Sequence, residues 1–307
     1  MISEKLFQGY DEKFISNQTV PLPKLSQEQS ADLAFDDEGN DVIKYINYSL
    51  QQSASHKFPF YTATNVDGIQ FKKVPRKDNW RKDKRLSKEF QLGKELYSAP
   101  KSDFDKGHMT KREDVQWGET LGIALNAANS TFYYTNAVPQ HKDLNRDIWR
   151  ILEDYILHTE TRQSELRICV FTGPVLSSSN PYFVTPINGK HIQIPTLFWK
   201  VVFFKKENGN LYRVGFMMSQ DKLLLKSYII EELESDDKLF MQFKDAETYQ
   251  VNISLIEELT GLKIPVAIDA YTDKRNAKLV LKEIDIDPEL ETYSIVNNLG
   301  FVINIKL

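Results

Sequence analysis

The stretch SDFDKGHMTKREDVQWG, residues 102–118, places a histidine directly after a glycine, between a cation and a methionine, with charged residues after it. His108 taken alone fits a turn or a core position as well as it fits a general base. Met109 is apolar and is expected in the core. Whether this stretch forms a catalytic hairpin therefore depends on what the rest of the chain places beside it.

Length and composition limit the class of protein. The chain has 307 residues, of which 41% are hydrophobic, so it can bury a substantial core. Its formal net charge is −4, so a polyanionic partner would need a local basic patch. The single cysteine, Cys169, lies in the apolar run RICVFTG. One cysteine excludes an internal disulfide and any multi-cysteine metal site, and we expect it to be buried.

The sequence gives no signal for membrane insertion. The N-terminal residues MISEKLFQGYDEKFISNQ lack a continuous apolar segment, and no run approaches the ~18 apolar residues of a membrane span. We expect a protein without membrane contact that is cytoplasmic or is exported without a Sec-type signal.

Three regions differ in pattern. Residues 1–40 are polar and predict an arm outside the core, residues 41–265 carry the main domain, and residues 266–307 predict a β-rich extension. Alternating or apolar runs predict strands within 45–62, LRICVFTGP (166–174), IQIPTLFWKVVFF (192–204) and LYRVGFMMS (211–219).

Helical patterns are fewer. TLGIALNAAN (120–129) and ISLIEELTG (253–261) predict short helices, the second closed by Gly261. DLNRDIWRILEDYILHTETR (143–162) has helical spacing, with Asp143 as its N-cap. STFYYTNAVPQ (130–140) is β-branched and aromatic, which predicts a strand stopped by Pro139.

A basic run lies upstream of the opening stretch. Residues 72–89 hold nine Lys/Arg against three Asp/Glu, an excess of six positive charges (9 − 3). The run is either a solvated charged loop or a phosphate-contacting rim, and the second reading gains if phosphate chemistry lies nearby. Its candidate nucleic-acid contacts are Arg76, Arg81 and Arg85.

Phosphodiester hydrolysis needs a base to activate water and a cation to neutralise developing charge. Histidine suits the first role, because a pKa of about 6.5 leaves it largely neutral at neutral pH. Mg²⁺ suits the second, since it takes hard oxygen ligands, such as an asparagine carbonyl, and keeps several waters. Asn145 and Glu153 stand eight residues apart on the predicted helix, about 12 Å along its axis. Both cannot bind one Mg²⁺ directly, so Glu153 is better placed to hold a metal-bound water.

Three motifs combine with these positions. They are DKGH (105–108), NAVPQ (136–140) and LNRDIWRILED (144–154), and FTGP, IPTLFWKVV and LTGL follow later in the chain. Together they closely resemble the DNA/RNA non-specific endonucleases, metal-dependent nucleases with a ββα-metal (His-Me) finger that include mitochondrial endonuclease G. The resemblance covers roughly residues 45–265.

The resemblance implies roles for particular residues. His108 corresponds to the general base, Asn145 to the direct Mg²⁺ ligand and Glu153 to the group behind a metal-bound water. Asn136 corresponds to the asparagine that helps shape the site. The implied cofactor is Mg²⁺, with Mn²⁺ as a substitute.

The sequence departs from the family pattern in two places. The cation of the first motif, usually arginine, is Lys106, which keeps the charge but loses the bidentate fork. A cation often found one turn after the family glutamate is replaced by Leu157. Transition-state charge could then be met by Lys106, Arg112 or a residue of the 72–89 run, with Arg76 and Arg85 as the candidates there.

These observations predict an α+β protein with a mostly antiparallel central sheet, flanking helices and a ββα-metal finger at about 103–160. The function implied is endonucleolytic cleavage of DNA and RNA. The alternatives are a catalytically weak module that binds nucleic acid or a protein, and a phosphodiesterase for a small substrate. We also expect a regulatory or immunity protein to bind the terminal extensions, and the chain could form a homodimer. Trp117 and Trp149 are expected to be packing residues.

Overall fold

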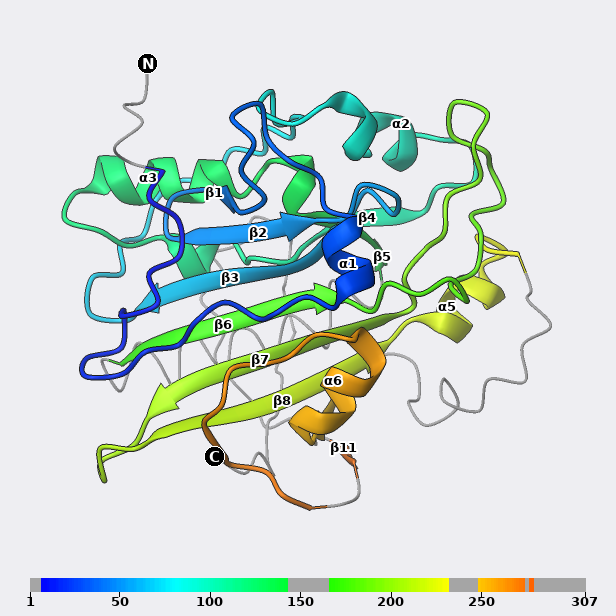
Figure 1. Cartoon of the computed structure of the whole chain (residues 1–307). Coiled ribbons are helices and arrows are strands. Elements are labelled where there is room, and N and C mark those ends of the chain that lie inside the picture. Colours follow the sequence, from blue (N-terminus) through cyan, green and yellow to red (C-terminus); the bar gives the residue numbers. More distant parts are fainter. Residues whose placement is uncertain (1–6, 143–165, 232–247, 274–275, 279–307) are drawn as a thin grey trace, which may run out of the picture.

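The computed structural model describes residues 7–142, 166–231, 248–273 and 276–278. In this part of the chain, one long sheet runs through the molecule and a separate two-stranded hairpin lies beside it, with helices packed around both (Figure 1). The predicted α+β class is confirmed. The described residues include no helix that is both long and apolar enough to cross a membrane.

The long sheet has the strand order β1-β2-β3-β6-β7-β8-β9-β11, with β10 added beside β8. All its pairs are antiparallel except β10 with β8, which is parallel. The strands are β1 (Ile43–Lys44), β2 (Tyr48–Gln52), β3 (Pro59–Asp67), β6 (Arg167–Pro174), β7 (Leu197–Lys205), β8 (Leu211–Ser219), β9 (Thr248–Val251), β10 (Ile268–Asp269) and β11 (Ala277–Lys278).

The central strands are apolar on both faces because both faces are covered. Along β6, Ile168 and Val170 enter one core, whereas Cys169 and Phe171 enter the other. Successive strand residues point to opposite faces, so a continuous apolar run fits a strand between two cores. We call the core of Ile168 and Val170 the hairpin-side core, since the hairpin packs there. The second core contains Cys169 and Phe171, and we call it the strap-side core because the N-terminal segment lies across it like a strap.

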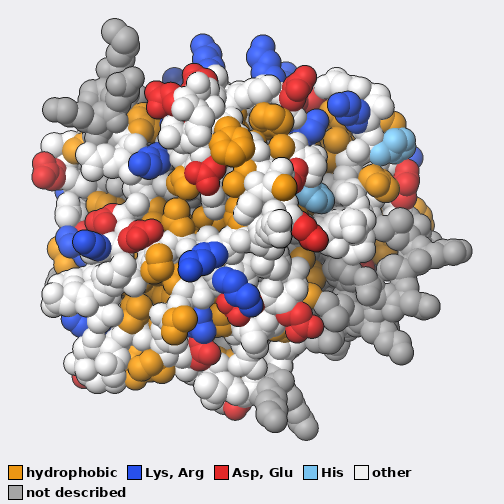
Figure 2. All heavy atoms as spheres, viewed as in Figure 1, with side chains coloured by type: hydrophobic (Ala, Val, Ile, Leu, Met, Phe, Trp, Pro, Cys, Tyr) orange, Lys and Arg blue, Asp and Glu red, His pale blue; other side chains and the backbone are white. Residues whose placement is uncertain are grey.

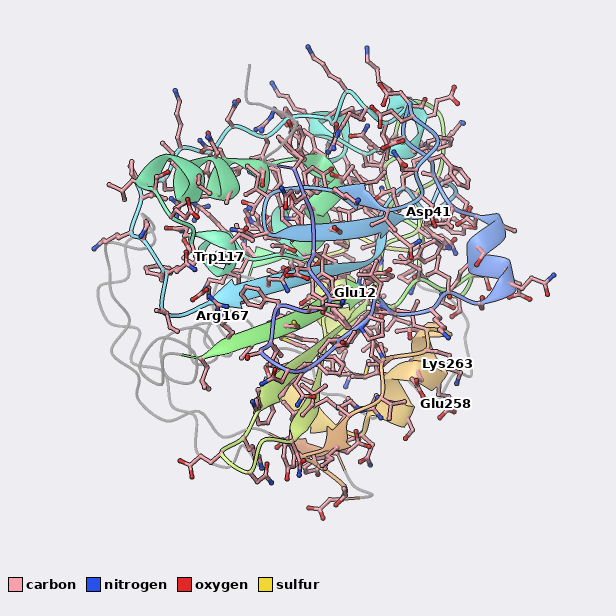
Figure 3. The ribbon with its side chains drawn as sticks, turned by 60° about the vertical axis from the view of Figure 1, so that its left-hand side comes forward. Glu12, Asp41, Trp117, Arg167, Glu258 and Lys263 are labelled. Atoms are coloured by element: carbon pink, nitrogen blue, oxygen red, sulfur yellow. The ribbon has the colours of Figure 1, made fainter. Side chains whose placement is uncertain are left out.

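The N-terminal segment forms part of the strap-side core. Phe14, Ile15 and Val20 are buried there, and the segment crosses the sheet face in extended form (Figure 1). Trp117 and Arg167 lie close together beside the end of β6 where Arg167 begins the strand (Figure 3), and both contact the ring of Phe14. The expectation that residues 1–40 lie outside the core is therefore wrong for this segment. Its polar appearance came from the residues between the few apolar anchors.

Short helices fill the periphery. They are α1 (Gln27–Ala31), α2 (Lys94–Tyr97), α3 (Leu121–Ser130), α5 (Asp221–Lys226) and α6 (Ile253–Thr260), with 3₁₀ turns at Lys88–Phe90, Glu113–Val115 and Tyr134–Asn136. The two predicted short helices are confirmed as α3 and α6. Gly261 ends α6 with φ of 71°, the left-handed conformation that glycine adopts without strain. The predicted helix at 143–162 lies outside the described residues, as do Trp149 and most of the predicted C-terminal extension.

The hairpin consists of β4 (Phe104–His108) and β5 (Ala137–His141). Its apolar residues Phe104 and Val138 pack into the hairpin-side core. The expectation that Pro139 stops a strand is wrong, because β5 begins at Ala137 and runs through it. The Pro139 carbonyl points away from β4 and accepts a bond from Gln220 Nε2 (3.1 Å), so its missing N–H would not have faced β4.

Gln220 fastens the hairpin to the rest of the fold. Its side chain is fully buried. Its amide makes the hydrogen bonds that a neighbouring strand would otherwise make to the free edge of β5. Its Oε1 accepts from the backbone N–H of His141 (2.7 Å), and its Nε2 also donates to the Pro195 carbonyl (2.7 Å). The hairpin therefore has a fixed position relative to β8, which ends just before Gln220.

Candidate active site

His108 is the last residue of β4, and its imidazole lies among aromatic rings. The ring centroid is 4.6 Å from that of Trp80 and 5.2 Å from that of Phe132. Nε2 is buried and makes no hydrogen bond within the described part of the chain. Buried polar atoms are almost always paired, so an unpaired nitrogen at the end of a catalytic-type hairpin needs a functional explanation.

The surroundings of His108 keep its imidazole neutral. Burial holds the pKa of His108 well below its usual value, because the charged form loses its hydration. Neighbouring positive charges lower the pKa further, and these come from Arg76, Arg112, Lys106 and Lys111. A neutral imidazole with an unpaired nitrogen can accept a proton, which is the requirement for a general base.

Lys106 lies on the same face of β4 as His108, two residues earlier. Its Nζ is 5.5 Å from the ring centroid of Tyr97 and 6.0 Å from that of Trp80. The ammonium is thus held close to the aromatic faces beside His108. It supplies the positive charge that the family arginine would supply at this position.

Asn136 lies directly behind the catalytic strand and is fully buried. Its Oδ1 accepts from the Thr110 N–H (2.8 Å), and its Nδ2 donates to the carbonyls of Thr110 (2.9 Å) and Thr131 (3.1 Å). Its own carbonyl accepts from the Met109 N–H (2.9 Å). Asn136 therefore fixes the backbone that follows His108, and a side chain so enclosed positions the site without touching a substrate.

Gly107 is required by the packing of its own hairpin. A Cβ built on Gly107 would lie 2.1 Å from Oε1 of Gln140 on β5, closer than atoms can approach. Gln140 is fully buried, and both polar atoms of its amide lack hydrogen-bond partners among the described residues. The glycine of the DKGH stretch therefore leaves room for the Gln140 side chain of the neighbouring strand.

Arg76 reaches the site from the basic run. Its guanidinium carbon lies 5.9 Å from the centroid of Phe132, the ring that also contacts His108. Its Nε pairs with Asp78 (2.7 Å), and the Arg76 side chain is 16% exposed. Among the predicted nucleic-acid contacts, Arg76 and Arg112 are the two whose charge lowers the pKa of His108, and Arg76 also shares the Phe132 ring with it.

Arg112 has a different environment from the one predicted. Its side chain is 3% exposed and pairs with Glu113 (2.9 Å), which is equally buried. Its Nη2 donates to the carbonyls of Val74 (2.8 Å) and Pro75 (2.9 Å). Direct contact of Arg112 with phosphate stays a prediction, and such a contact would require Arg112 to leave these partners. It instead anchors the backbone just before Arg76.

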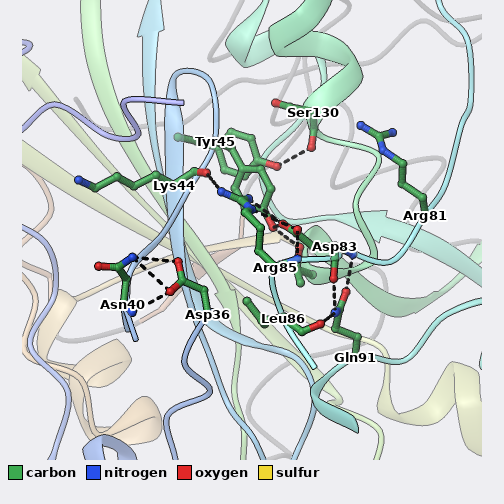
Figure 4. A network of polar contacts seen from close by, with 12 residues as sticks. Asp36, Asn40, Lys44, Tyr45, Arg81, Asp83, Arg85, Leu86, Gln91 and Ser130 are labelled. Atoms are coloured by element: carbon green, nitrogen blue, oxygen red, sulfur yellow. Dashed lines mark hydrogen bonds and ion pairs between the residues drawn. The ribbon is translucent and has the colours of Figure 1, made fainter. Parts of the chain in front are cut away.

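Arg81 and Arg85 make contacts within the fold. Arg85 forms a two-pronged pair with the buried Asp83, through Nη2 (2.7 Å) and Nε (3.1 Å) (Figure 4). Its Nη1 donates to the Lys44 carbonyl (2.9 Å). Arg81 donates to the carbonyls of Asn79 (2.9 Å) and Asn129 (3.2 Å), and its guanidinium covers the ring of Tyr133. Direct contact of these two arginines with nucleic acid stays a prediction.

Exposed lysines carry further positive charge of the run. Lys77, Lys84 and Lys88 are exposed, unlike the two arginines just described. Elsewhere, positive and negative side chains are interspersed on the face that Figure 2 shows.

The predicted metal ligands lie outside the described residues. Asn145 and Glu153 both belong to the 143–165 segment, so the structure does not place them. Among the residues that it does place, no group of three or more His, Cys, Asp or Glu side chains is arranged to hold a metal ion. The described residues of the candidate site are thus His108 and the cations whose charge lowers its pKa.

Comparison with known proteins connects this geometry to a family. The model of the DNA/RNA non-specific endonucleases matches residues 27–270, most of the chain. This chain belongs to that family. Its members are metal-dependent nucleases that bind nucleic acid. His108, with its buried and unpaired Nε2, therefore lies on the hairpin that carries the DKGH motif, which resembles the motif of this family.

Individual relatives are distant. The endonuclease is 30% identical to the uncharacterised protein y4fB of Sinorhizobium fredii over 91% of this chain but 42% of that protein. It is 26% identical to a nuclease of Nostoc sp. over 80% of this chain and 85% of the relative. It is 26% identical to human mitochondrial endonuclease G over 52% of this chain and 48% of that protein. The chain thus spans less than half the length of two of these relatives.

The fold is shared with solved structures. The crystal structure of the EndoG/EndoGI complex matches with a TM-score of 0.52 and 20% identity, covering 73% of this endonuclease and 84% of that chain. At this identity the match shows the fold.

The sequence analysis missed two residues of the site, Trp80 and Phe132. Both contact His108 through their rings. Neither belongs to the three motifs, and aromatic residues in a polar run usually indicate packing. The available signal was an aromatic residue within a strongly basic segment.

Proposed function

We propose that this endonuclease hydrolyses phosphodiester bonds of DNA and RNA without sequence preference, using His108 as general base and Mg²⁺ as the cation. The observation that carries the proposal is the unpaired, buried Nε2 of a neutral His108 at the end of the hairpin. Such a nitrogen takes a proton from the attacking water as the water adds to phosphorus.

The cations around His108 would stabilise the negative charge that develops on the phosphate during hydrolysis. Negative charge grows on the phosphate oxygens as water adds, and Arg76 and Lys106 are placed to stabilise it. Bound Mg²⁺, held by Asn145 with Glu153 behind a metal-bound water, would neutralise charge on the phosphate and the leaving oxygen. We expect products with 5′-phosphate and 3′-hydroxyl ends, as the family resemblance implies.

Partners and location belong to the same proposal. We expect a regulatory or immunity protein, or a second copy of the chain, to bind outside the site. The EndoG/EndoGI structure shows that one structural neighbour is bound by an inhibitor. Residues 1–40 and 266–307 are the candidates for such contacts. A cytoplasmic location, or export without a Sec-type signal, also remains part of the proposal.

Plasmid digestion with and without Mg²⁺, comparing wild type with His108→Ala, tests the proposal. The variant should lose cleavage by about 10²–10⁴-fold, because that is the usual cost of removing a general base. His191→Ala is the matched control, since His191 is 57% exposed and has no contact with the hairpin in the described structure. DNA bound but not cut by the wild-type protein at any Mg²⁺ or Mn²⁺ concentration would favour a binding module. Cleavage of dinucleotides alone would favour a small-substrate phosphodiesterase.

A further inference from the structure

Trp80 is the closest aromatic neighbour of His108 and belongs to a loop remote in sequence. Trp80, Phe132 and His108 contact one another pairwise, with Trp80 and Phe132 5.3 Å apart at 85° and Phe132 and His108 5.2 Å apart at 80°. The imidazole is thus held against an indole and a phenyl ring. The tilt of 49° between Trp80 and His108 places the imidazole obliquely on the indole.

No hydrogen bond at Nε2 fixes the orientation of the His108 ring, because this nitrogen has no partner among the described residues. Rotation of an imidazole about χ2 is soft, so a ring without such a bond needs another restraint. Contact with two differently oriented rings supplies one, because rotation in either direction would drive the imidazole into a ring or open a void.

Trp80 is itself held firmly. Its indole contacts Tyr134 (5.7 Å) and lies under the ammonium of Lys106 (6.0 Å). The next residue, Arg81, pairs by backbone with the segment just before β5, donating to the Phe132 carbonyl (3.0 Å) and accepting from the Tyr134 N–H (2.9 Å). The indole is thus attached to the segment that carries Phe132.

We propose that Trp80 is a positioning residue that fixes the imidazole of His108 in the orientation needed to accept the proton of the attacking water. The proposal rests on the proposed function of His108. It assigns the aromatic residue of the basic run to catalysis through His108, not to contact with a nucleobase. Trp80 itself touches no reacting atom.

The test compares Trp80→Leu, Trp80→Phe and the control Trp117→Phe. Trp117 is a half-buried tryptophan that packs on Phe14, away from His108. Trp80→Leu should lower kcat by about 10- to 100-fold with KM changed less than about twofold, because a small misplacement of a catalytic group slows the chemical step. Trp80→Phe should restore most of kcat, and Trp117→Phe should leave it unchanged.

A change in KM with kcat preserved would overturn the proposal, since it would mean that Trp80 contacts substrate. Equal losses of kcat in Trp80→Leu and Trp117→Phe would also overturn it, by showing a general structural effect. Nuclear Overhauser contacts between the His108 ring protons and Phe132, measured without substrate, report the orientation of the imidazole and do not depend on catalysis. Loss of these contacts in Trp80→Leu supports positioning even if His108→Ala later proves active, whereas unchanged contacts contradict it. Urea unfolding confirms that each variant is folded.

Discussion

Residues 72–80 and residues 81–91 are two halves of one basic segment, and the fold uses them differently. The first half brings Arg76 and Trp80 to the aromatic surroundings of His108. The second half holds its arginines in internal contacts, with Arg85 on Asp83 and Arg81 on backbone carbonyls. A charged run therefore shows in sequence how much charge is present, but the partners of each side chain decide whether that charge serves the site or the fold.

The largest effect on stability should come from Asp83, the centre of the second half. Its carboxylate is 3% exposed and accepts from Tyr45 Oη (2.7 Å) and Arg85 Nη2 (2.7 Å). Asp83→Asn should lower the free energy of unfolding by about 2–3 kcal/mol, because the Tyr45 hydroxyl and the Arg85 guanidinium, which is 32% exposed, both lose a charged acceptor. Urea denaturation measures this, with cleavage assayed well below the unfolding midpoint.

Asp78→Asn is the matched control for Asp83→Asn, from the first half of the segment. Asp78 pairs with Arg76 at the surface and is 40% exposed, so its loss should cost at most about 1 kcal/mol. Equal destabilisation by the two changes would remove the contrast between the halves.

Arg112→Lys should act on the first half from a distance. Lysine keeps the charge but cannot bond the carbonyls of Val74 and Pro75 and the carboxylate of Glu113 together. We expect a loss of about 2 kcal/mol in stability and a fall in kcat, because residues 74–80 lose their anchor. The salt dependence of DNA binding should stay unchanged. Unchanged stability and kcat in Arg112→Lys would show that Arg112 does not anchor residues 74–80.

The exposed lysines should carry the electrostatic part of DNA binding. Lys77, Lys84 and Lys88 changed together to Gln should reduce the slope of log K against log salt by up to about 2.7 units, about 0.9 for each phosphate that is no longer neutralised. Arg81→Gln with Arg85→Gln should reduce it less, since these guanidinium groups have partners within the fold. Fluorescence anisotropy with duplex DNA at several salt concentrations separates the two sets. The reverse ranking would mean that the arginines leave their internal contacts on binding.

The smallest effect concerns acid stability. The pKa of His108 is lowered in the folded state, so the unfolded state, with a pKa of about 6.5, binds the proton more readily. Stability is therefore complete above about pH 6.5 and falls as the pH drops toward the lower, folded pKa. His108→Gln should lessen this fall in unfolding experiments between about pH 6.5 and 5. An identical pH dependence in the variant would show that the imidazole is not buried in its neutral form.

Local sequence predicted the local structure well. The apolar run around Cys169 predicted a strand, and Gly261 predicted a helix end, because strand alternation and the left-handed cap are properties of neighbouring residues. The 102–118 stretch predicted a site at His108 through its motif. Contacts between distant residues could not be predicted this way. Trp80 lies 28 positions before His108, and no spacing rule joins a loop tryptophan to a strand histidine.

The same limit explains the errors. The sequence makes Arg112 a candidate for meeting the charge of a phosphate, which requires an accessible side chain, yet Lys111, Arg112, Glu113 and Asp114 are all buried. Ion pairing within that group, and carbonyls from residues 74–75, make such burial tolerable. The N-terminal segment was assigned to an arm, although Phe14, Ile15 and Val20 enter the strap-side core. In both cases the partners that compensate are far away in sequence.

One paired measurement tests most directly whether the two halves of the segment have separate roles. It determines kcat for plasmid cleavage in Mg²⁺ and the free energy of unfolding for Arg76→Gln and Arg85→Gln. Arg76→Gln should lower kcat by about 10²-fold, as loss of a charge-stabilising donor does, with stability within about 1 kcal/mol of wild type. Arg85→Gln should lose about 1–3 kcal/mol of stability, less than a fully buried pair because its side chain is 32% exposed, and keep its kcat. A larger loss of kcat in Arg85→Gln than in Arg76→Gln, with both proteins folded, would contradict the account.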